Sequence, residues 1–262
     1  MGRLVAIMVD RSVLSSLAIV APAFDEADGI EATTLGWIAS LSAHGPAAHE
    51  VVVCNDGSRD RTGDILEAVA RCHPVLRVVH HASNRGAAQA VATAVAASTA
   101  NWILIVDADG QFPLSCLDEF ARARHRDPRA AAFIGARRSK RDDRFARFGA
   151  RVTTAALNAV YGTGYRDLSS ACQLVRGDLL RALRFDARGL NYSVELSGKL
   201  LEAGIRPVEV EVDHLPRRTG RSTRTALRST LDRGAFVSYL AVRKLLVAQR
   251  VLAPWRPPDP PT

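Results

Sequence analysis

Two carboxylates one residue apart, Asp107 and Asp109, directly follow an apolar run at Trp102–Val106. Hard oxygen ligands at the end of a buried strand suit Mg²⁺ or Mn²⁺. A metal ion held there would bridge to phosphate oxygens and neutralise the charge that builds on a leaving pyrophosphate. Because Asp and Gly are also frequent in turns, the pair taken alone is a weak signal that an acidic turn would also produce.

Acidic residues follow two earlier apolar runs as well. Asp25-Glu26 comes after Leu17–Ala23, and Asn55-Asp56 comes after Glu50–Cys54. A carboxylate in such a place can accept a hydrogen bond from the N–H edge of uracil or guanine, or from a ribose hydroxyl. Asp60 also fits the N-cap of a helix, which would be a structural role.

Short apolar runs alternate with helical patterns in the first half of the chain. The expected strands are Leu17–Ala23, Glu50–Cys54, Val75–His80, Trp102–Val106 and Ala130–Ala136. The expected helices between them are Ala27–Ser42, Asp60–Cys72, Gly86–Ser98 and Leu114–Arg126. This alternation predicts an α/β fold with a mostly parallel central sheet covered by helices on both faces. Ligands bind at the carboxyl ends of such strands, so the polar clusters should gather along one edge.

The second half of the chain is less regular. Helices are expected at Asp143–Tyr161 and Tyr192–Ala203, with strands at Ala171–Val175 and Val208–Val212. The length fits one large domain with a short appendage. The predicted organisation is an N-terminal extension (1–16), a catalytic domain (17–224), an amphipathic helical segment (225–253) and a proline-rich, disordered tail (254–262).

Four ordered motifs carry a family resemblance. They are P-x-F-D-E at Pro22–Glu26, N-D-G-S-x-D-x-T at Asn55–Thr62, N-x-G-x-x-x-A at Asn84–Ala90 and D-A-D-x-Q at Asp107–Gln111. Together they resemble the family 2 glycosyltransferases with the GT-A fold. That resemblance implies metal contacts from Asp107, Asp109 and Gln111. It implies nucleotide-sugar contacts from Pro22, Phe24, Glu26, Cys54, Asp56, Asp107, Ala108, Asp109 and Gln111.

Three later segments resemble the dolichol-phosphate mannose synthase-like branch of that family, which transfers sugars to polyprenyl phosphates. They are Asp167–Arg176, Tyr192–Leu196 and Val210–Ser222, so the similarity covers about residues 17 to 228. In that branch the last segment is a mobile loop whose Arg and Ser hold phosphate. Arg217 and Ser222 take those places here.

The middle segment departs most from the branch. Ala171 replaces Gly, Cys172 replaces an aromatic residue, and Gln173 replaces a basic residue that would contact phosphate. This loss puts the lipid-phosphate acceptor in doubt. Arg137 could supply the missing charge and contact the nucleotide sugar, or it could be a solvated surface side chain.

The resemblance implies direct displacement at the anomeric carbon with inversion. Asp109 would stay ionised on the metal, and Arg217 would close over the phosphates. A phosphate acceptor, with a second pKa of ~6, needs no strong base. A hydroxyl acceptor does, and Glu195 and Asp167 are the candidates. Glu195 equally fits a structural ion pair at a helix start.

Two enzymatic hypotheses therefore stand. The first is transfer of a hexose from a UDP- or GDP-sugar to a polyprenyl phosphate. The second is a soluble, metal-dependent glycosyltransferase that acts on a small molecule such as a secondary metabolite. A binding module without catalysis is disfavoured by the intact Asp107, Asp109 and Gln111. A nucleotidyltransferase is disfavoured because Ala21–Asp28 contains neither Gly nor Lys.

Composition narrows the partners and the compartment. The net charge of +8 fits either an anionic partner or a basic proteome, and no aromatic residues interleave with the arginines as nucleic-acid binding would require. Four widely spaced cysteines suggest neither zinc nor disulfides, and indicate a reducing cytoplasm. Neither a signal peptide nor a transmembrane run is expected. The segment 225–253 would lie on the cytoplasmic membrane face, or pack on the catalytic domain or on a second subunit.

Overall fold

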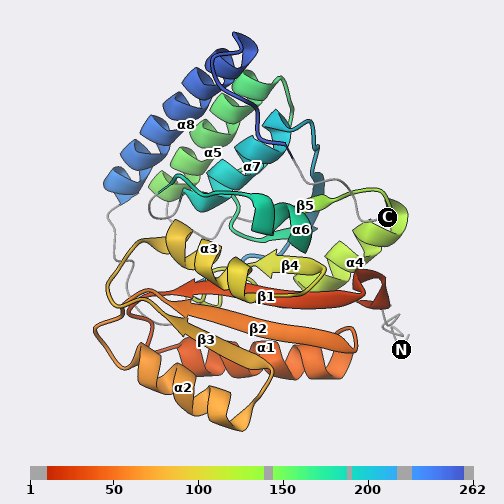
Figure 1. The fold of residues 1–262 in the computed structure, drawn as a ribbon, viewed down its shortest axis with the longest axis vertical. Helices are drawn as coiled ribbons and strands as arrows, with labels where there is room; N and C mark the ends of the chain where they lie inside the picture. Colours follow the sequence, from red (N-terminus) through yellow and green to blue (C-terminus); the bar gives the residue numbers. More distant parts are fainter. Residues whose placement is uncertain (1–10, 139–143, 188–190, 217–225, 257–262) are drawn as a thin grey trace.

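The computed structural model describes residues 11–138, 144–187, 191–216 and 226–256. Within these residues, seven strands form one sheet in the order β3-β2-β1-β4-β6-β5-β7 (Figure 1). The strands are β1 (Ser16–Ala23), β2 (Ala48–Asn55), β3 (Leu76–His80), β4 (Trp102–Ile105), β5 (Ala132–Arg137), β6 (Gln173–Arg176) and β7 (Val208–Val212). The helices are η1 (Arg11–Leu14), α1 (Ile30–His44), α2 (Thr62–Cys72), α3 (Ala87–Ala97), α4 (Cys116–Arg126), α5 (Arg144–Tyr161), α6 (Gly177–Ala182), α7 (Tyr192–Glu202) and α8 (Ala226–Ala248).

The sheet confirms the predicted α/β architecture. β1 pairs in parallel with β2 and β4, β2 with β3, and β5 with β7. β6 is the exception, because it runs antiparallel between β4 and β5. The register sets Pro22 beside Cys54 and Ala23 beside Asn55, so the first two polar motifs leave the sheet at the same edge.

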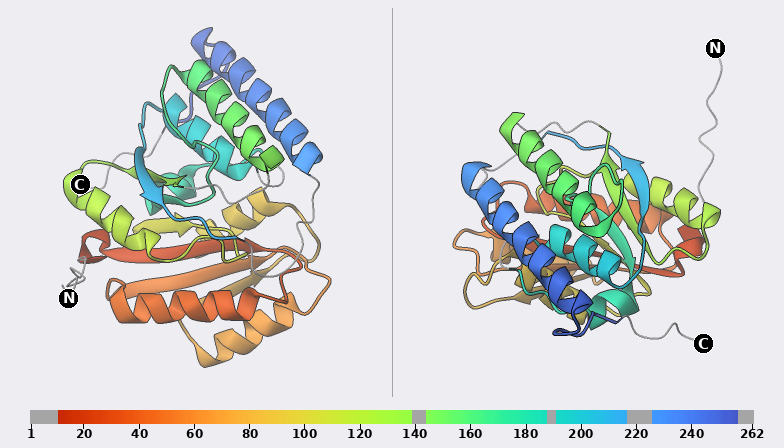
Figure 2. Two further views of the ribbon diagram at one scale, coloured as in Figure 1. Left: turned by 180° about the vertical axis from the view of Figure 1, so that it is seen from behind. Right: turned by 90° about the horizontal axis from the view of Figure 1, so that it is seen from above.

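Alternate residues of β1 are buried on opposite faces of the sheet, as the pleat requires. Leu17, Ile19 and Ala21 belong to one apolar cluster, whereas Ala18 and Val20 belong to the other. All five have no exposed surface. Helices thus cover both faces of the central strands (Figure 2). The packed strands support the loops that follow them at the carboxyl edge of the sheet.

The chain ends of the described region are packed more tightly than the predicted organisation suggests. Leu14 is fully buried in the core, although it falls within the predicted N-terminal extension. Helix α8 lies alongside α5 and α7 (Figure 1), and its Val237 and Leu240 share an apolar cluster with Leu157 and Val194. The C-terminal helix is therefore packed on the rest of the domain. No helix in the described part of the chain is long and apolar enough to cross a membrane.

Candidate active site

The loops after β1 and β2 are bound to each other by hydrogen bonds. The backbone N–H of Asp25 donates to Ser58 Oγ (3.1 Å), and the Asp25 carboxylate accepts from the N–H of Arg59 (2.7 Å). The N–H of Glu26 donates to Thr62 Oγ1 (2.9 Å). Asp25 adopts a positive φ of 54°, which a short polar residue tolerates better than most. The motifs at Pro22–Glu26 and Asn55–Thr62 thus form one wall.

Asp60 strengthens this wall but is not the N-cap of α2. The N-cap residue is Arg61, and the Asp60 carboxylate accepts from the N–H groups of Thr62 (2.9 Å) and Ala27 (3.0 Å). The N-cap prediction is therefore wrong by one position, because the carboxylate reaches past Arg61 and across to the β1 loop. Burial by itself raises the pKa of Asp60, but the hydrogen bond from the Thr62 hydroxyl, followed by those from the two N–H groups, outweighs it and the pKa is lowered.

Asp56 lies deep in the wall, with 2% of its surface exposed. Its carboxylate accepts from the N–H groups of Arg85 (2.9 Å) and Gly86 (2.8 Å), and lies 2.6 Å from His81 Nδ1. Gly57 has a φ of +69°, and a Cβ there would lie 2.5 Å from the carbonyl carbon of Ser83. The motifs at Asn55–Thr62 and Asn84–Ala90 are therefore brought together, as expected for a single edge.

Cys54 offers no exposed atom to a ligand, since its side chain is fully buried. Its Sγ lies 3.6 Å from His81 Nε2. Burial, followed by the nearby Asp56 carboxylate, raises the pKa of Cys54 to about 12. A ligand contact from this thiol stays a prediction, and its visible role is packing. Pro22, Phe24 and Glu26, in contrast, are half-buried and stand at the surface of the wall.

The two carboxylates that follow β4 differ from Asp56 because both are half-buried. Asp107 Oδ1 accepts from the Tyr192 hydroxyl (2.7 Å), and Asp109 Oδ1 accepts from the N–H of Gln111 (3.1 Å). Burial first, and then the charges of Asp107 and Asp109, raise the pKa of Tyr192 well above its usual value. The Tyr192 hydroxyl is thus bound directly to Asp107, and Asp109 follows two residues later in the same turn.

These residues fit a divalent ion that is completed by its ligand's phosphates. Mg²⁺-type ions are commonly bound through one or two carboxylates plus substrate phosphates, without an all-protein cage. Among the described residues, no group of three or more His, Cys, Asp or Glu side chains could hold a metal ion by itself. Gln111 Nε2 donates to the Leu215 carbonyl (3.1 Å), so Oε1 is the side-chain atom left for a cation. The three metal assignments stay predictions.

Arg137, the last residue of β5, forms a buried ion pair with Asp167. Arg137 Nε donates to Asp167 Oδ2 (2.7 Å), and Nη2 donates to Oδ1 (3.0 Å) and to Ser169 Oγ (3.3 Å). The exposed fractions of the two side chains are 11% and 2%. Arg137 is therefore no solvated surface residue. Both oxygens of Asp167 are engaged by the guanidinium, which gives this base candidate a visible structural role.

Glu195, the other base candidate, has no exposed surface. Its carboxylate accepts from the N–H groups of Asp186 (2.7 Å) and Ala187 (2.9 Å), and lies 2.7 Å from Lys199 Nζ. This geometry matches the structural ion pair that the sequence left open. Gln173 is also fully buried, and its amide donates to the Ser170 carbonyl (2.9 Å). The position that carries a basic residue in the resembling branch thus points into the protein.

The remaining predicted residues are Arg217, Ser222 and Ala108, and two further residues contact the site without having been predicted. Arg217 and Ser222 lie outside the described residues. Ala108 is buried. Tyr192 and His81 contact the motif carboxylates Asp107 and Asp56, and sequence reasoning assigned neither of them a role. No local pattern could have found Tyr192, because its partner is 85 residues away.

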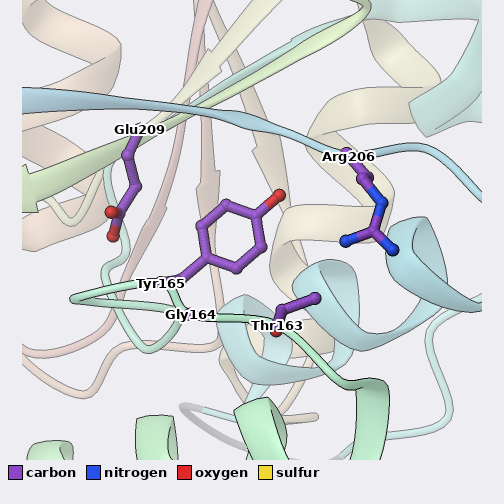
Figure 3. A pocket seen from close by; sticks show the side chains of 5 residues that line it. All are labelled: Thr163, Gly164, Tyr165, Arg206 and Glu209. Carbon is purple, nitrogen blue, oxygen red and sulfur yellow. The ribbon is translucent and has the colours of Figure 1, made fainter.

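A separate hollow lies between the loop after α5 and the start of β7 (Figure 3). Its volume is about 300 Å³, and it is lined by Thr163, Gly164, Tyr165, Arg206 and Glu209. The phenol of Tyr165 points toward Arg206 in Figure 3. The Glu209 carboxylate accepts hydrogen bonds from the N–H groups of Arg166 (2.7 Å) and Asp167 (2.9 Å). Its carboxylate thus anchors the loop that leads to the Arg137–Asp167 pair.

Comparison with known proteins identifies the family. The profile of glycosyl transferase family 2 matches residues 18–184. A dolichyl-phosphate beta-glucosyltransferase of Trichomonas vaginalis is 33% identical over 38% of this chain and 30% of its own length. An undecaprenyl-phosphate 4-deoxy-4-formamido-L-arabinose transferase of Edwardsiella ictaluri is 24% identical over 82% of this chain and 65% of its own length. The chain thus spans less than two thirds of either relative.

Solved structures of low sequence identity share the fold. Glucosyl-3-phosphoglycerate synthase from Mycobacterium tuberculosis, in complex with Mn²⁺, UDP and glucosyl-3-phosphoglycerate, superposes with a TM-score of 0.65 at 20% identity, over 90% of this chain and 81% of its own. Mannosyl-3-phosphoglycerate synthase from Rubrobacter xylanophilus gives a TM-score of 0.65 at 16% identity, over 94% and 78%. The architecture is the GT-A fold. With the profile match over most of its length, the chain belongs to glycosyl transferase family 2.

Proposed function

We propose that this glycosyltransferase moves a hexose from a UDP- or GDP-sugar to the phosphate of a polyprenyl phosphate, with inversion at the anomeric carbon. The observation that carries the donor half is the turn after β4, where two half-buried carboxylates stand at the carboxyl end of the strand and one of them, Asp107, is held by the buried phenol of Tyr192. When bound, a divalent ion would neutralise the charge that develops on the departing nucleoside diphosphate. Asp107 and Asp109 would hold that ion.

The residues of the wall would bind the nucleoside. Pro22, Phe24 and Glu26 are half-buried at its surface, where a base can pack against them. Asp56 lies behind them and fixes the loops before α2 and α3 through its hydrogen bonds. Only 2% of the surface of Asp56 is exposed, so a contact with the nucleobase would have to be made there.

The buried ion pairs of the two candidate general bases, Asp167 and Glu195, favour an acceptor that needs no base, such as a phosphate. Glu195 and Asp167 are both held in buried ion pairs, so neither is placed to remove a proton from a hydroxyl. A phosphate monoester is already a dianion near neutral pH and needs no such base. Arg137 ends β5, is 11% exposed and would contribute positive charge toward the phosphate. The lipid-phosphate relatives favour a polyprenyl carrier.

A second candidate is transfer to a small, soluble phosphate-bearing acceptor. Gln173 is fully buried and carries no charge, so the basic contact of the lipid-phosphate branch is missing at this position. A structural neighbour of similar size is a synthase solved with phosphoglyceric acid. Both candidates require recognition of a phosphate group, but they differ in the nucleophile. A phosphate oxygen would attack in the lipid acceptor, whereas a hydroxyl of the small acceptor would attack and would need a base.

A lipid acceptor implies contact with a membrane surface, and we propose that exposed apolar side chains of α5 and α8 provide it at the cytoplasmic face. Phe148 on α5 and Leu245 on α8 are each 62% exposed, and Val152 and Val242 are 48% and 54% exposed. Arg144–Tyr161 contains three arginines and no acidic residue. Exposed apolar side chains on a basic helix pair suit an anionic lipid surface.

One assay separates the two acceptors. Purified protein is incubated with Mn²⁺ and radiolabelled UDP- or GDP-hexoses, with either undecaprenyl phosphate or 3-phosphoglycerate as acceptor. Label that partitions into the organic phase only with undecaprenyl phosphate supports the lipid acceptor. Label that stays in a charged, water-soluble product only with 3-phosphoglycerate supports the second candidate. No transfer to either from any common donor would contradict both.

A further inference from the structure

Tyr192 of α7 contacts the turn after β4 (Asp107–Gln111), which is distant from it in the sequence. Its side chain is 1% exposed, and its hydroxyl donates to Asp107 Oδ1 over 2.7 Å. Tyr192 is the first residue of α7, whereas Asp107 follows β4 on the other side of the chain's midpoint. Tyr192 begins the segment Tyr192–Leu196 that resembles the family branch, but that resemblance assigns the phenol no role. The proposed reaction does not require the phenol as an acid or a base either.

Helix α7 is an unusually fixed support for a side chain. Every residue from Tyr192 to Leu200 is buried, including the polar ones. Ser197 Oγ donates to the Leu168 carbonyl (3.0 Å), and Ser193 Oγ donates to the Ser169 carbonyl (3.3 Å). Glu195 ties the helix to the backbone of Asp186. A helix held on several sides leaves the phenol little freedom to move relative to β4.

We propose that Tyr192 is a positioning residue for the metal site, through Asp107. Its hydrogen bond occupies one carboxylate oxygen and selects one orientation of the side chain before any ion arrives. Groups that orient a metal-binding side chain in this way typically contribute about 10–100-fold to metal affinity or activity. The inference rests on the proposed metal role of Asp107 and gives a role to a residue to which the family resemblance assigns none.

The same helix also reaches the acceptor side of the site. Ser193 and Ser197 bind the backbone of the loop that carries Asp167, and Asp167 holds Arg137. One rigid element therefore sets both a donor-side carboxylate and the loop beside the proposed acceptor phosphate. Loss of the phenol should disturb only the first of these, because the serine contacts remain.

The test compares Mn²⁺ binding by the wild type, Tyr192→Phe and Tyr161→Phe, with UDP or GDP present, by the electron paramagnetic resonance of free Mn²⁺. Tyr161 is the matched control, since its buried hydroxyl has no hydrogen-bond partner among the described residues. We expect about 10–100-fold weaker Mn²⁺ binding in Tyr192→Phe only. Equal affinity in the wild type and Tyr192→Phe would overturn the inference alone. A wild type without Mn²⁺ binding would overturn the metal site and the inference together.

A double-mutant cycle keeps the inference testable if Tyr192→Phe is poorly folded. Tyr192→Phe is made in the wild type and in Asp107→Asn, and urea unfolding is measured without metal. If the phenol acts on Asp107, its removal should shift the urea midpoint differently in the two backgrounds, because contacting residues are not additive. Equal shifts in both backgrounds would show that Tyr192 merely fills the core.

Discussion

At the residue scale, burial separates the carboxylates that the motifs treat alike. Asp56, Asp167 and Glu195 are almost fully buried and their oxygens are engaged, whereas Asp107 and Asp109 are half-buried. The motifs could predict which residue types occur, but not which of them face solvent. Burial depends on partners such as Lys199 or Arg137, whose proximity is set by packing and not by spacing along the chain.

Glu195 provides a test of this distinction. Because its carboxylate neutralises the buried Lys199 and accepts two backbone N–H groups, Glu195→Gln should lower the free energy of unfolding by about 3–5 kcal/mol. The turnover number of the folded variant should stay within a few-fold of the wild type. Urea unfolding and initial-rate kinetics below the melting transition measure the two effects. Unchanged stability with a turnover number reduced more than about 100-fold would instead make Glu195 catalytic.

At the element scale, the sequence was informative wherever periodicity was strong. All of the strands and helices expected from Leu17 to Val212 are present, with ends shifted by a few residues. The short helix α6 was not predicted, because its six residues span too few turns to show a period. The antiparallel direction of β6 was not predictable either, because the pattern of a buried strand carries no direction. Because β6 runs antiparallel, it begins with Gln173 opposite Ile105, so the chain that leads into β6 arrives near the end of β4.

The β2–α2 turn should be sensitive to a single methyl group. Gly57→Ala places a Cβ 2.5 Å from the Ser83 carbonyl carbon at a φ of +69°, so the wall must shift. We expect a loss of about 1–3 kcal/mol in the free energy of unfolding, and weaker nucleotide binding. Gly36→Ala is the control, because nothing lies within 4 Å of that added Cβ in α1. It should be neutral or stabilising by up to about 1 kcal/mol. Equal urea midpoints for the two variants would contradict the close approach.

At the scale of the whole molecule, charge and exposed apolar side chains are the features with consequences beyond the site. The net charge of +8 was visible in the sequence, as was the amphipathic character of the C-terminal segment. What the sequence left open was whether α8 packs on the domain or lies on a membrane. The structure shows packing through Val237 and Leu240, and leaves Val242 and Leu245 exposed on the same helix. One helix can therefore serve both purposes, because its faces differ.

Vesicle flotation tests the proposed lipid surface. The wild type should bind vesicles that contain phosphatidylglycerol and bind phosphatidylcholine vesicles less, with binding weakened by salt. Phe148→Ser combined with Leu245→Ser should reduce the bound fraction several-fold, because two largely exposed apolar side chains are lost. Leu35→Ser on α1 is the matched control, at 37% exposure. Undiminished vesicle binding by the double variant would contradict this surface. A wild-type dimer that dissociates in the double variant would also contradict it, because these side chains would then form a contact between subunits.

The central claim is that Asp107 and Asp109 hold the donor's pyrophosphate through a divalent ion. Titration calorimetry of UDP and GDP against the wild type and Asp109→Asn, each with Mn²⁺ or with a chelator, tests it most directly. The account predicts that one nucleotide binds the wild type with Mn²⁺, and that the chelator or Asp109→Asn weakens binding at least about 10-fold. Binding that is equally tight with the chelator, or unchanged in Asp109→Asn, would contradict it.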